Sequence, residues 1–254
     1  MRRVRSLFLG HTVSVHKPRP AVKNQWYMVL RIWRNYNHDD IGLERLIRLM
    51  LAITQFLSLG LYIKQFTGRW GSQIRKLITE VYVILKLIFP LVIFRHNLEG
   101  EFWAAILTAY FLSETVLYLG GLVFLQDVSN YKVSPKRSLA LLFVNFFELV
   151  FEFGLLYAFL SSSDPGDFSR SLTEAHDAIY FSFVTGATLG YGDIVPLSSA
   201  ARELVMVQMT LTFVFVGLFI NYFASLLQKF TPQTSAASDS KKIRHRRRTS
   251  RPAK

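Results

Sequence analysis

The chain has 254 residues, of which 51% are hydrophobic and 15% are aromatic, and its formal net charge is +13. Its apolar runs are longer than those of a soluble domain, which indicates an integral membrane protein and leaves no room for a large soluble domain. The absence of cysteine excludes a disulfide framework and a thiolate metal site.

The positive charge is concentrated near the two ends of the sequence. Residues 1–23 carry six Lys and Arg and no acid, and residues 239–254 carry eight against Asp239. The 215 residues between them have 16 basic and 16 acidic side chains. Basic tails beside membrane segments are typical of cytoplasmic ends and of contact with anionic lipid. We therefore expect the two basic ends to contact membrane lipid and not to bind nucleic acid.

The sequence before the first clear span divides into two parts. Residues 1–40 are expected to form a basic cytoplasmic segment. Residues 41–66 form either an amphipathic helix on the inner membrane surface or a further transmembrane helix, built on the apolar run 46–63. A span here would place the basic N-terminal residues outside the membrane, so the positive-inside rule favours the surface helix.

Residues 77–126 are predicted to form a transmembrane hairpin. The second apolar segment, 102–126, carries one charge and is long enough to span a membrane. The first segment, 77–94, contains two charges and a proline, so it is either a span that faces protein or an interfacial helix.

The charges of the loops decide between these topologies. Loops 64–76 and 127–137 are basic, which is typical of the cytoplasmic side, whereas loops 95–101 and 161–178 are net acidic. This alternation fits a multi-pass protein of a plasma or inner membrane with both termini in the cytoplasm. The four expected spans are 77–94, 102–126, 139–160 and 204–227.

Three ionisable residues fall near mid-membrane depth on three different predicted spans: Lys86, Glu114 and Glu148. An isolated charge at the bilayer centre costs at least roughly 2.5–3.5 kcal/mol on insertion scales. We therefore expect Lys86 to pair with Glu114 or Glu148 and to dock the hairpin against the helix at 139–160. Asn145 and Glu152 share the helical face of Glu148, so we expect that they can complete the polar contact. The alternative is that the first segment lies flat, with Lys86 in water.

A glycine-rich loop, "TGATLGYGDIVP" at residues 185–196, lies between the last two spans. The residues Ser171 to Glu174 have capping-box spacing, which predicts a re-entrant half-helix over 172–186 that is too short to cross a bilayer. Irregular backbone is tolerated at membrane depth only where it is buried in protein or lines a wet cavity. Gly190 and Gly192 permit backbone angles closed to other residues, so consecutive carbonyls can face one way and replace the water around a cation.

The spaced threonines and the GYGD sequence resemble the signature of the potassium channel family. The resemblance extends over residues 138–229, as outer helix, pore helix, filter and inner helix. It implies an all-α integral membrane protein in which a potassium-channel pore domain follows additional N-terminal helices, and it implies a homotetramer that conducts K⁺. The matching residues are Thr185, Thr188, Gly190, Tyr191, Gly192 and Asp193.

The resemblance also implies residue roles. K⁺ would bind the carbonyls of a short filter and the hydroxyl of its threonine, with an aspartate at the outer mouth and two pore-helix aromatics packed against the filter tyrosine. Ordinary core or lipid-facing packing is the alternative for those aromatics. The residues are Thr188, Leu189, Gly190, Tyr191 and Gly192 for the filter, Asp193 for the mouth, and Tyr180, Phe181 and Thr185 for the support.

Several positions depart from the family pattern. Leu189 replaces the usual valine or isoleucine, and Ala187 stands where threonine or serine is common. Val184 occupies the position of a glutamate that some members place behind the filter. Thr212 stands at the usual hinge glycine of the inner helix, so Gly217, five residues later, is either a hinge or a site of close packing. These departures keep every filter carbonyl but put the stability of the filter in question.

Other functions find little support in the sequence. A voltage sensor needs several regularly spaced arginines within a span, and segment 102–126 has none. The histidines lack metal-ligand spacing, so we expect neither an enzyme nor a cofactor beyond K⁺ in the filter. The polar, basic residues 230–254 are expected to be a disordered cytoplasmic tail that binds anionic lipid. The alternative function is a non-selective or non-conducting regulatory pore subunit.

Overall fold

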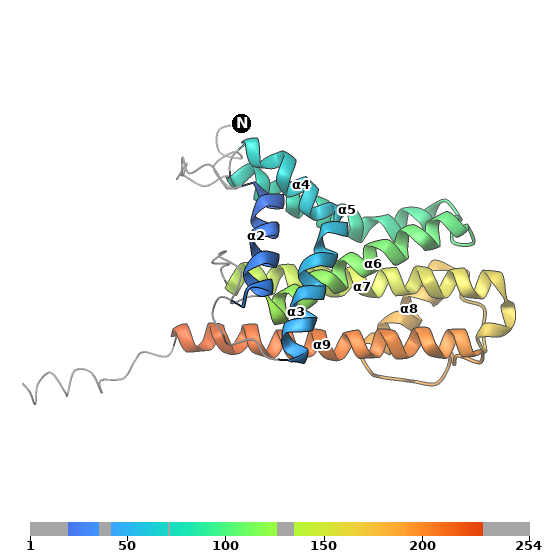
Figure 1. The fold of residues 1–254 in the computed structure, drawn as a ribbon. Helices are drawn as coiled ribbons and strands as arrows, with labels where there is room; N and C mark the ends of the chain where they lie inside the picture. Colours follow the sequence, from blue (N-terminus) through green and yellow to red (C-terminus); the bar gives the residue numbers. More distant parts are fainter. Residues whose placement is uncertain (1–19, 36–41, 71, 126–134, 231–254) are drawn as a thin grey trace, which may run out of the picture.

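The computed structural model describes residues 20–35, 42–70, 72–125 and 135–230, and helices account for the regular structure within these ranges (Figure 1). The expected all-α fold class is confirmed. The long helices are α5 (Ser72–Arg95), α6 (Phe102–Phe124), α7 (Pro135–Ser163) and α9 (Ser199–Phe230), and the short ones are α2 (Ala21–Trp33), α3 (Leu43–Thr54), α4 (Leu59–Thr67) and α8 (Ala175–Gly186).

The four long helices are long and apolar enough to cross a membrane, and they coincide with the four predicted spans. Helices α5, α7 and α9 extend beyond their membrane-length parts, whereas the membrane-length part of α6 is the whole helix. Proline at the first position of α7 fits there because that N–H would have no helical partner. The membrane-length parts are Leu77–Arg95, Phe102–Phe124, Ser138–Ser163 and Ser199–Ala224.

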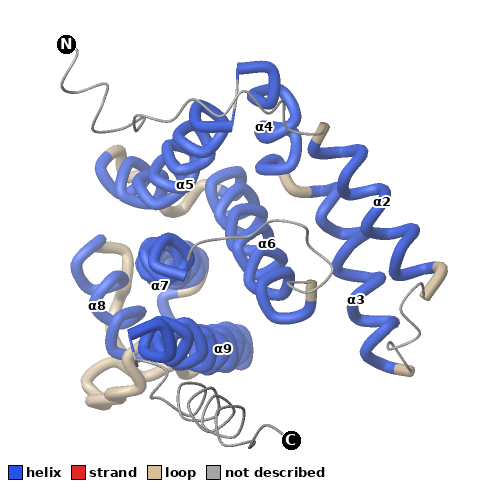
Figure 2. Tube along the Cα trace, turned by 90° about the vertical axis from the view of Figure 1, so that its left-hand side faces the viewer, coloured by secondary structure: helices blue, strands red, loops and turns tan. Residues whose placement is uncertain are grey.

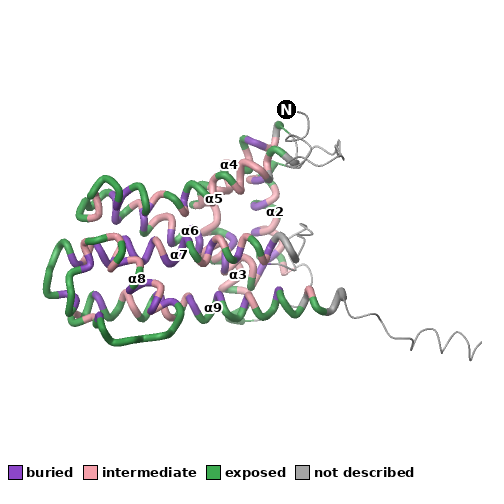
Figure 3. The backbone as a smooth tube through the Cα atoms, turned by 180° about the vertical axis from the view of Figure 1, so that it is seen from behind, coloured by how far each residue is buried: buried purple, intermediate pink, exposed green. Residues whose placement is uncertain are grey.

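Helix α7 is the centre of the bundle. It packs against α5 and α6 on one side and against α8 and α9 on the other (Figure 2). Leu142, Leu149, Phe153 and Tyr157 along α7 are fully buried. The long helices also carry many exposed residues (Figure 3), and a large share of these are large and apolar. A helix surrounded by lipid or by further copies of the chain requires such a surface.

The N-terminal helices form a second, smaller core. Val29 and Ile32 of α2 pack with Ala52 of α3 and Leu125 at the end of α6. The Gln25 side chain donates a hydrogen bond of 2.8 Å to the carbonyl of Ala52. Helix α2 lies within the segment 1–40 that was predicted only as a basic cytoplasmic segment. The remainder of that segment, residues 1–19 and 36–40, lies outside the described residues, as does 231–254 of the predicted tail.

The segment predicted as one helix over 41–66 is two helices. Helices α3 and α4 are bent by 66° where Ser58 adopts an extended conformation, and together they form either a broken span or a re-entrant pair. Both lie in the half of the bundle away from the α8 loop (Figures 1 and 3).

Candidate functional site

Helix α8 is a half-helix that packs against α7 and α9. Its 12 residues give a length of about 18 Å, short of the roughly 30 Å of a hydrocarbon core. The predicted capping box is wrong, since α8 begins at Ala175 and its N-cap, Glu174, makes no side-chain capping bond. The Ser171 hydroxyl instead lies 3.2 Å from the Thr173 hydroxyl, in the loop before the helix.

The segments on either side of α8 and its loop are joined to each other. The backbone N–H of Ser169 donates to the carbonyl of Val195 at 3.0 Å, and the N–H of Val195 donates to the Ser169 hydroxyl at 3.0 Å. The N–H of Leu197 donates to the carbonyl of Asp167 at 2.8 Å. These bonds fix the far end of the glycine-rich loop to the loop that precedes α8.

The backbone between these fixed points alternates in handedness. Thr188, Gly190 and Gly192 have φ values of 56°, 58° and 77°, whereas the intervening Leu189 and Tyr191 do not have positive φ. Alternation of this kind turns successive carbonyls toward one side, which a regular helix or strand does not do. The two glycines adopt these angles without steric cost, whereas Thr188 pays of order 1–3 kcal/mol.

Two hydrogen bonds to α8 hold the first turn of this loop. The N–H of Thr188 donates to the Thr185 carbonyl at 3.0 Å, and that of Leu189 donates to the Val184 carbonyl at 3.0 Å. Beyond them the loop is open within one chain. Leu189 and Tyr191 are 56% and 66% exposed, although their loop follows a half-helix that packs between two helices of membrane-spanning length. Irregular backbone at that depth has to be covered by further protein or water.

Tyr180 and Phe181 of α8 face different surroundings. The hydrogen bond from the Tyr180 hydroxyl to the Asp193 carboxylate raises the pKa of Tyr180 above its usual value. Phe181 is buried, with its ring centroid 4.9 Å from that of Tyr157 and 5.5 Å from that of Phe168. Phe181 therefore belongs to the core within the chain, and the packing of Tyr180 and Phe181 against the filter tyrosine stays a prediction.

A buried glutamine on α9 connects three helices behind the loop. The amide oxygen of Gln208 accepts a hydrogen bond of 2.6 Å from the Tyr157 hydroxyl of α7. Its amide nitrogen donates to the Ser182 carbonyl and hydroxyl of α8, both at 2.9 Å. The Ser182 hydroxyl in turn donates to the Val150 carbonyl at 2.6 Å. Sequence reasoning missed this glutamine, although an amide side chain within a largely apolar span is a visible signal.

The two positions singled out on the inner helix lie inside a continuous α9. Thr212 is buried and its hydroxyl donates to the Gln208 carbonyl at 3.0 Å. An added methyl group at Gly217 would meet no atom within 4 Å, so no contact within the chain requires glycine there. Close packing is thus absent at Gly217 among the described residues, and the hinge stays a prediction.

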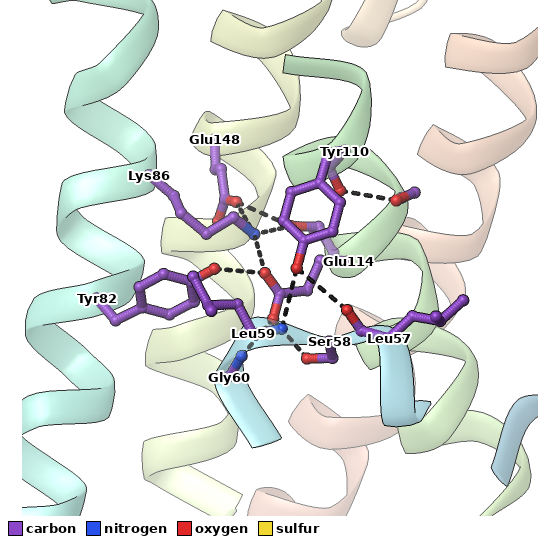
Figure 4. A network of polar contacts seen from close by, with 11 residues as sticks. Leu57, Ser58, Leu59, Gly60, Tyr82, Lys86, Tyr110, Glu114 and Glu148 are labelled. Atoms are coloured by element: carbon purple, nitrogen blue, oxygen red, sulfur yellow. Dashed lines mark hydrogen bonds and ion pairs between the residues drawn. The ribbon is translucent and has the colours of Figure 1, made fainter. Parts of the chain in front are cut away.

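The structure brings the three mid-membrane residues together, as Figure 4 shows. The Lys86 ammonium lies 2.6 Å from a Glu148 oxygen and 4.0 Å from a Glu114 oxygen. It also donates to the Thr115 hydroxyl at 2.8 Å, which donates to Glu148 at 2.8 Å. Lys86 is 5% exposed, so α5 does not lie flat with this side chain in water.

Glu114 also closes the break between α3 and α4 (Figure 4). Its carboxylate accepts hydrogen bonds from the Gly60 N–H at 2.8 Å, the Ser58 hydroxyl and the Tyr82 hydroxyl. It therefore caps the N-terminus of α4, where the helix dipole favours negative charge. The Tyr110 hydroxyl bridges the break as well, since it accepts from the N–H of Leu59 and donates to the carbonyl of Leu57.

Comparison with known proteins gives one finding. Residues 142–229 match a family model described as "Ion channel". The match covers most of α7, all of α8 and its loop, and nearly all of α9. The comparison with curated proteins found no match, and neither did the comparison with solved structures.

Proposed function

We propose that this protein is a potassium-selective channel assembled from four copies of the chain, because residues 142–229 match an ion channel family model and four described helices are long and apolar enough to cross a membrane. The loop at 188–192 is then the selectivity filter. The carbonyls of Thr188, Leu189, Gly190 and Tyr191 and the Thr188 hydroxyl coordinate K⁺, and Asp193 lies at the outer mouth.

The observation that carries this proposal is the alternating backbone of the loop. Positive φ at Thr188, Gly190 and Gly192 allows successive carbonyls to share one direction. A dehydrated cation needs many oxygens at close range, and one chain supplies a single column of them. The exposure of Leu189 and Tyr191 in a single chain supports a closed ring of copies, in which neighbouring chains cover these side chains.

The arrangement of the remaining helices supports a channel with both termini in the cytoplasm. The bent pair α3 and α4 stays in the half of the bundle away from the filter, which favours a four-span topology. Helix α6 precedes the pore helices and contains no Lys or Arg, so a charged helix does not gate the channel by voltage.

Ion flux from liposomes tests the selectivity. Purified protein is reconstituted, and K⁺ and Na⁺ efflux are measured separately. The wild type should conduct K⁺ and exclude Na⁺. Gly190→Ala should abolish K⁺ flux, because alanine is strained at the φ of 58° that the filter needs. Gly68→Ala is the matched control, since Gly68 has an ordinary φ of −58° and open space around its Cα.

Other results would contradict the proposal. Equal flux of K⁺ and Na⁺ would make the chain a non-selective pore, and no flux from a folded protein would make it a regulatory subunit. Crosslinking in the same liposomes should give products of up to four chains and none that is larger. A conducting dimer or trimer would refute the assembly.

A further inference from the structure

The centre of the bundle holds more acidic than basic side chains. Among the described residues, Lys86 is the one basic side chain that meets Glu114, Glu148 and Glu152, and all four are at most 7% exposed. If every carboxyl were ionised, the site would carry three negative charges against one positive charge. The effective penalty of burying an ion is several kcal/mol, and it is offset only when partners and hydrogen bonds satisfy the charge.

Two of the three carboxyls have ion-pair or hydrogen-bond partners that stabilise a negative charge. Lys86 and the Thr115 hydroxyl contact one oxygen of Glu148. Glu114 receives three hydrogen bonds, one of them from the N-terminus of α4, which stabilises its negative charge. The charges of Lys86 and Glu114 and one oxygen of Glu148 thus have partners.

Glu152 has no such partners. It is fully buried one helical turn after Glu148, and neither of its oxygens receives a hydrogen bond from the part of the chain that the structure describes. The second oxygen of Glu148 receives none either. The two carboxyls nevertheless lie within hydrogen-bonding reach of each other. Two acceptors facing each other in a water-poor core lack a donor, and a proton on one of them supplies it.

The other groups around Glu152 do not supply this donor. The charged residues that act on it are Glu148 on α7, Lys86 on α5 and Glu114 on α6, and the described parts of α8 and α9 contribute none. Lys86 is already engaged by Glu148 and Thr115.

We propose that Glu152 and Glu148 form a proton-binding site in the membrane core. One proton is held on Glu152 at neutral pH and donated to the free oxygen of Glu148, which stays ionised beside Lys86. The site thereby retains one uncompensated charge, that of Glu114, and this charge is capped by α4. No group on the filter takes part.

Infrared spectroscopy of the full-length protein at neutral pH tests the site directly. The difference spectrum between wild type and Glu152→Gln should show the loss of one protonated carboxylic acid C=O band per chain. Glu203→Gln is the matched control, because Glu203 is an exposed carboxylate on α9 and its removal should leave that band in place. An unchanged carboxylic acid band in Glu152→Gln would overturn the proposal.

The pH dependence of unfolding supplies a second test. A proton held by the folded state and released on unfolding makes the fold less stable as pH rises. Above about pH 4.3, where an exposed glutamate loses its proton, the unfolding constant of the wild type should rise by up to about tenfold per pH unit relative to Glu152→Gln. Parallel curves for the two proteins would refute proton binding. Neither readout requires ion flux, so failure here is distinguishable from failure of the proposed potassium conduction.

Discussion

Replacement of Gln208 by leucine should weaken the fold where the pore helix meets its two neighbours. Leucine fills a similar volume but leaves the buried Tyr157 hydroxyl without its acceptor at 2.6 Å. An unsatisfied buried donor costs about 1–3 kcal/mol, and a lost hydrogen bond about 0.5–1.5 kcal/mol net. Ser182 keeps its bond to the Val150 carbonyl, so most of the cost falls on Tyr157. We expect a loss of about 2–4 kcal/mol in the free energy of unfolding.

Denaturant unfolding of the purified protein in detergent measures this loss. The second change Tyr157→Phe removes the orphaned hydroxyl, so the double variant should be more stable than Gln208→Leu alone by about 1–3 kcal/mol. Thr210→Val is the control, because Thr210 is exposed two residues later on α9 and its loss should stay within about 0.5 kcal/mol. Additive effects of the two changes, or equal losses at Gln208 and Thr210, would refute the reasoning.

Three further substitutions have defined outcomes. Lys86→Met should lower the free energy of unfolding by about 3–5 kcal/mol, because it leaves Glu148 unpaired. Adding Glu148→Gln to the same chain should restore part of that free energy. If the losses of the two single variants simply add in the double variant, the pairing is contradicted. Because the pKa of Tyr180 is raised, its hydroxyl keeps its proton and its hydrogen bond to Asp193 beyond about pH 10. K⁺ flux should therefore not change up to that pH. Tyr180→Phe, which removes the bond, should lower K⁺ flux several-fold at neutral pH. Gly217→Ala should raise unfolding stability by up to about 1 kcal/mol, since the methyl meets no atom; a hinge at this position would show as a simultaneous loss of flux.

The spans could be predicted because hydrocarbon imposes a length and a composition on any helix that crosses it. The same constraint located Lys86, Glu114 and Glu148 at one depth, and their mutual proximity follows from the cost of leaving any of them in lipid. Pairing among three helices is a long-range property, however. The predicted depth in the membrane left two acids, Glu114 and Glu148, as candidate partners of Lys86. That Glu148 is the nearer of the two depends on how the helices pack.

The prediction failed where local sequence was ambiguous. The capping-box residues Ser171 and Glu174 had the expected spacing, but Ser171 bonds within the loop and the helix begins later. Helix α2 was missed because the basic charge around it dominated the interpretation, although Gln25, Val29 and Ile32 lie on one helical face. The break at Ser58 depends on acceptors and donors supplied by α5 and α6, which no local pattern contains.

The order of residues along the chain suits the pair between Lys86 and Glu148. Synthesis proceeds from the N-terminus, so α5 and α6 emerge before α7. The lysine that compensates Glu148, the threonine that bridges them and the acid beside them are therefore already made when α7 arrives. The α5–α6 hairpin can therefore receive the two buried glutamates of α7 before α8 and α9 are made, and the helices of the pore half pack onto a partner that is synthesised earlier.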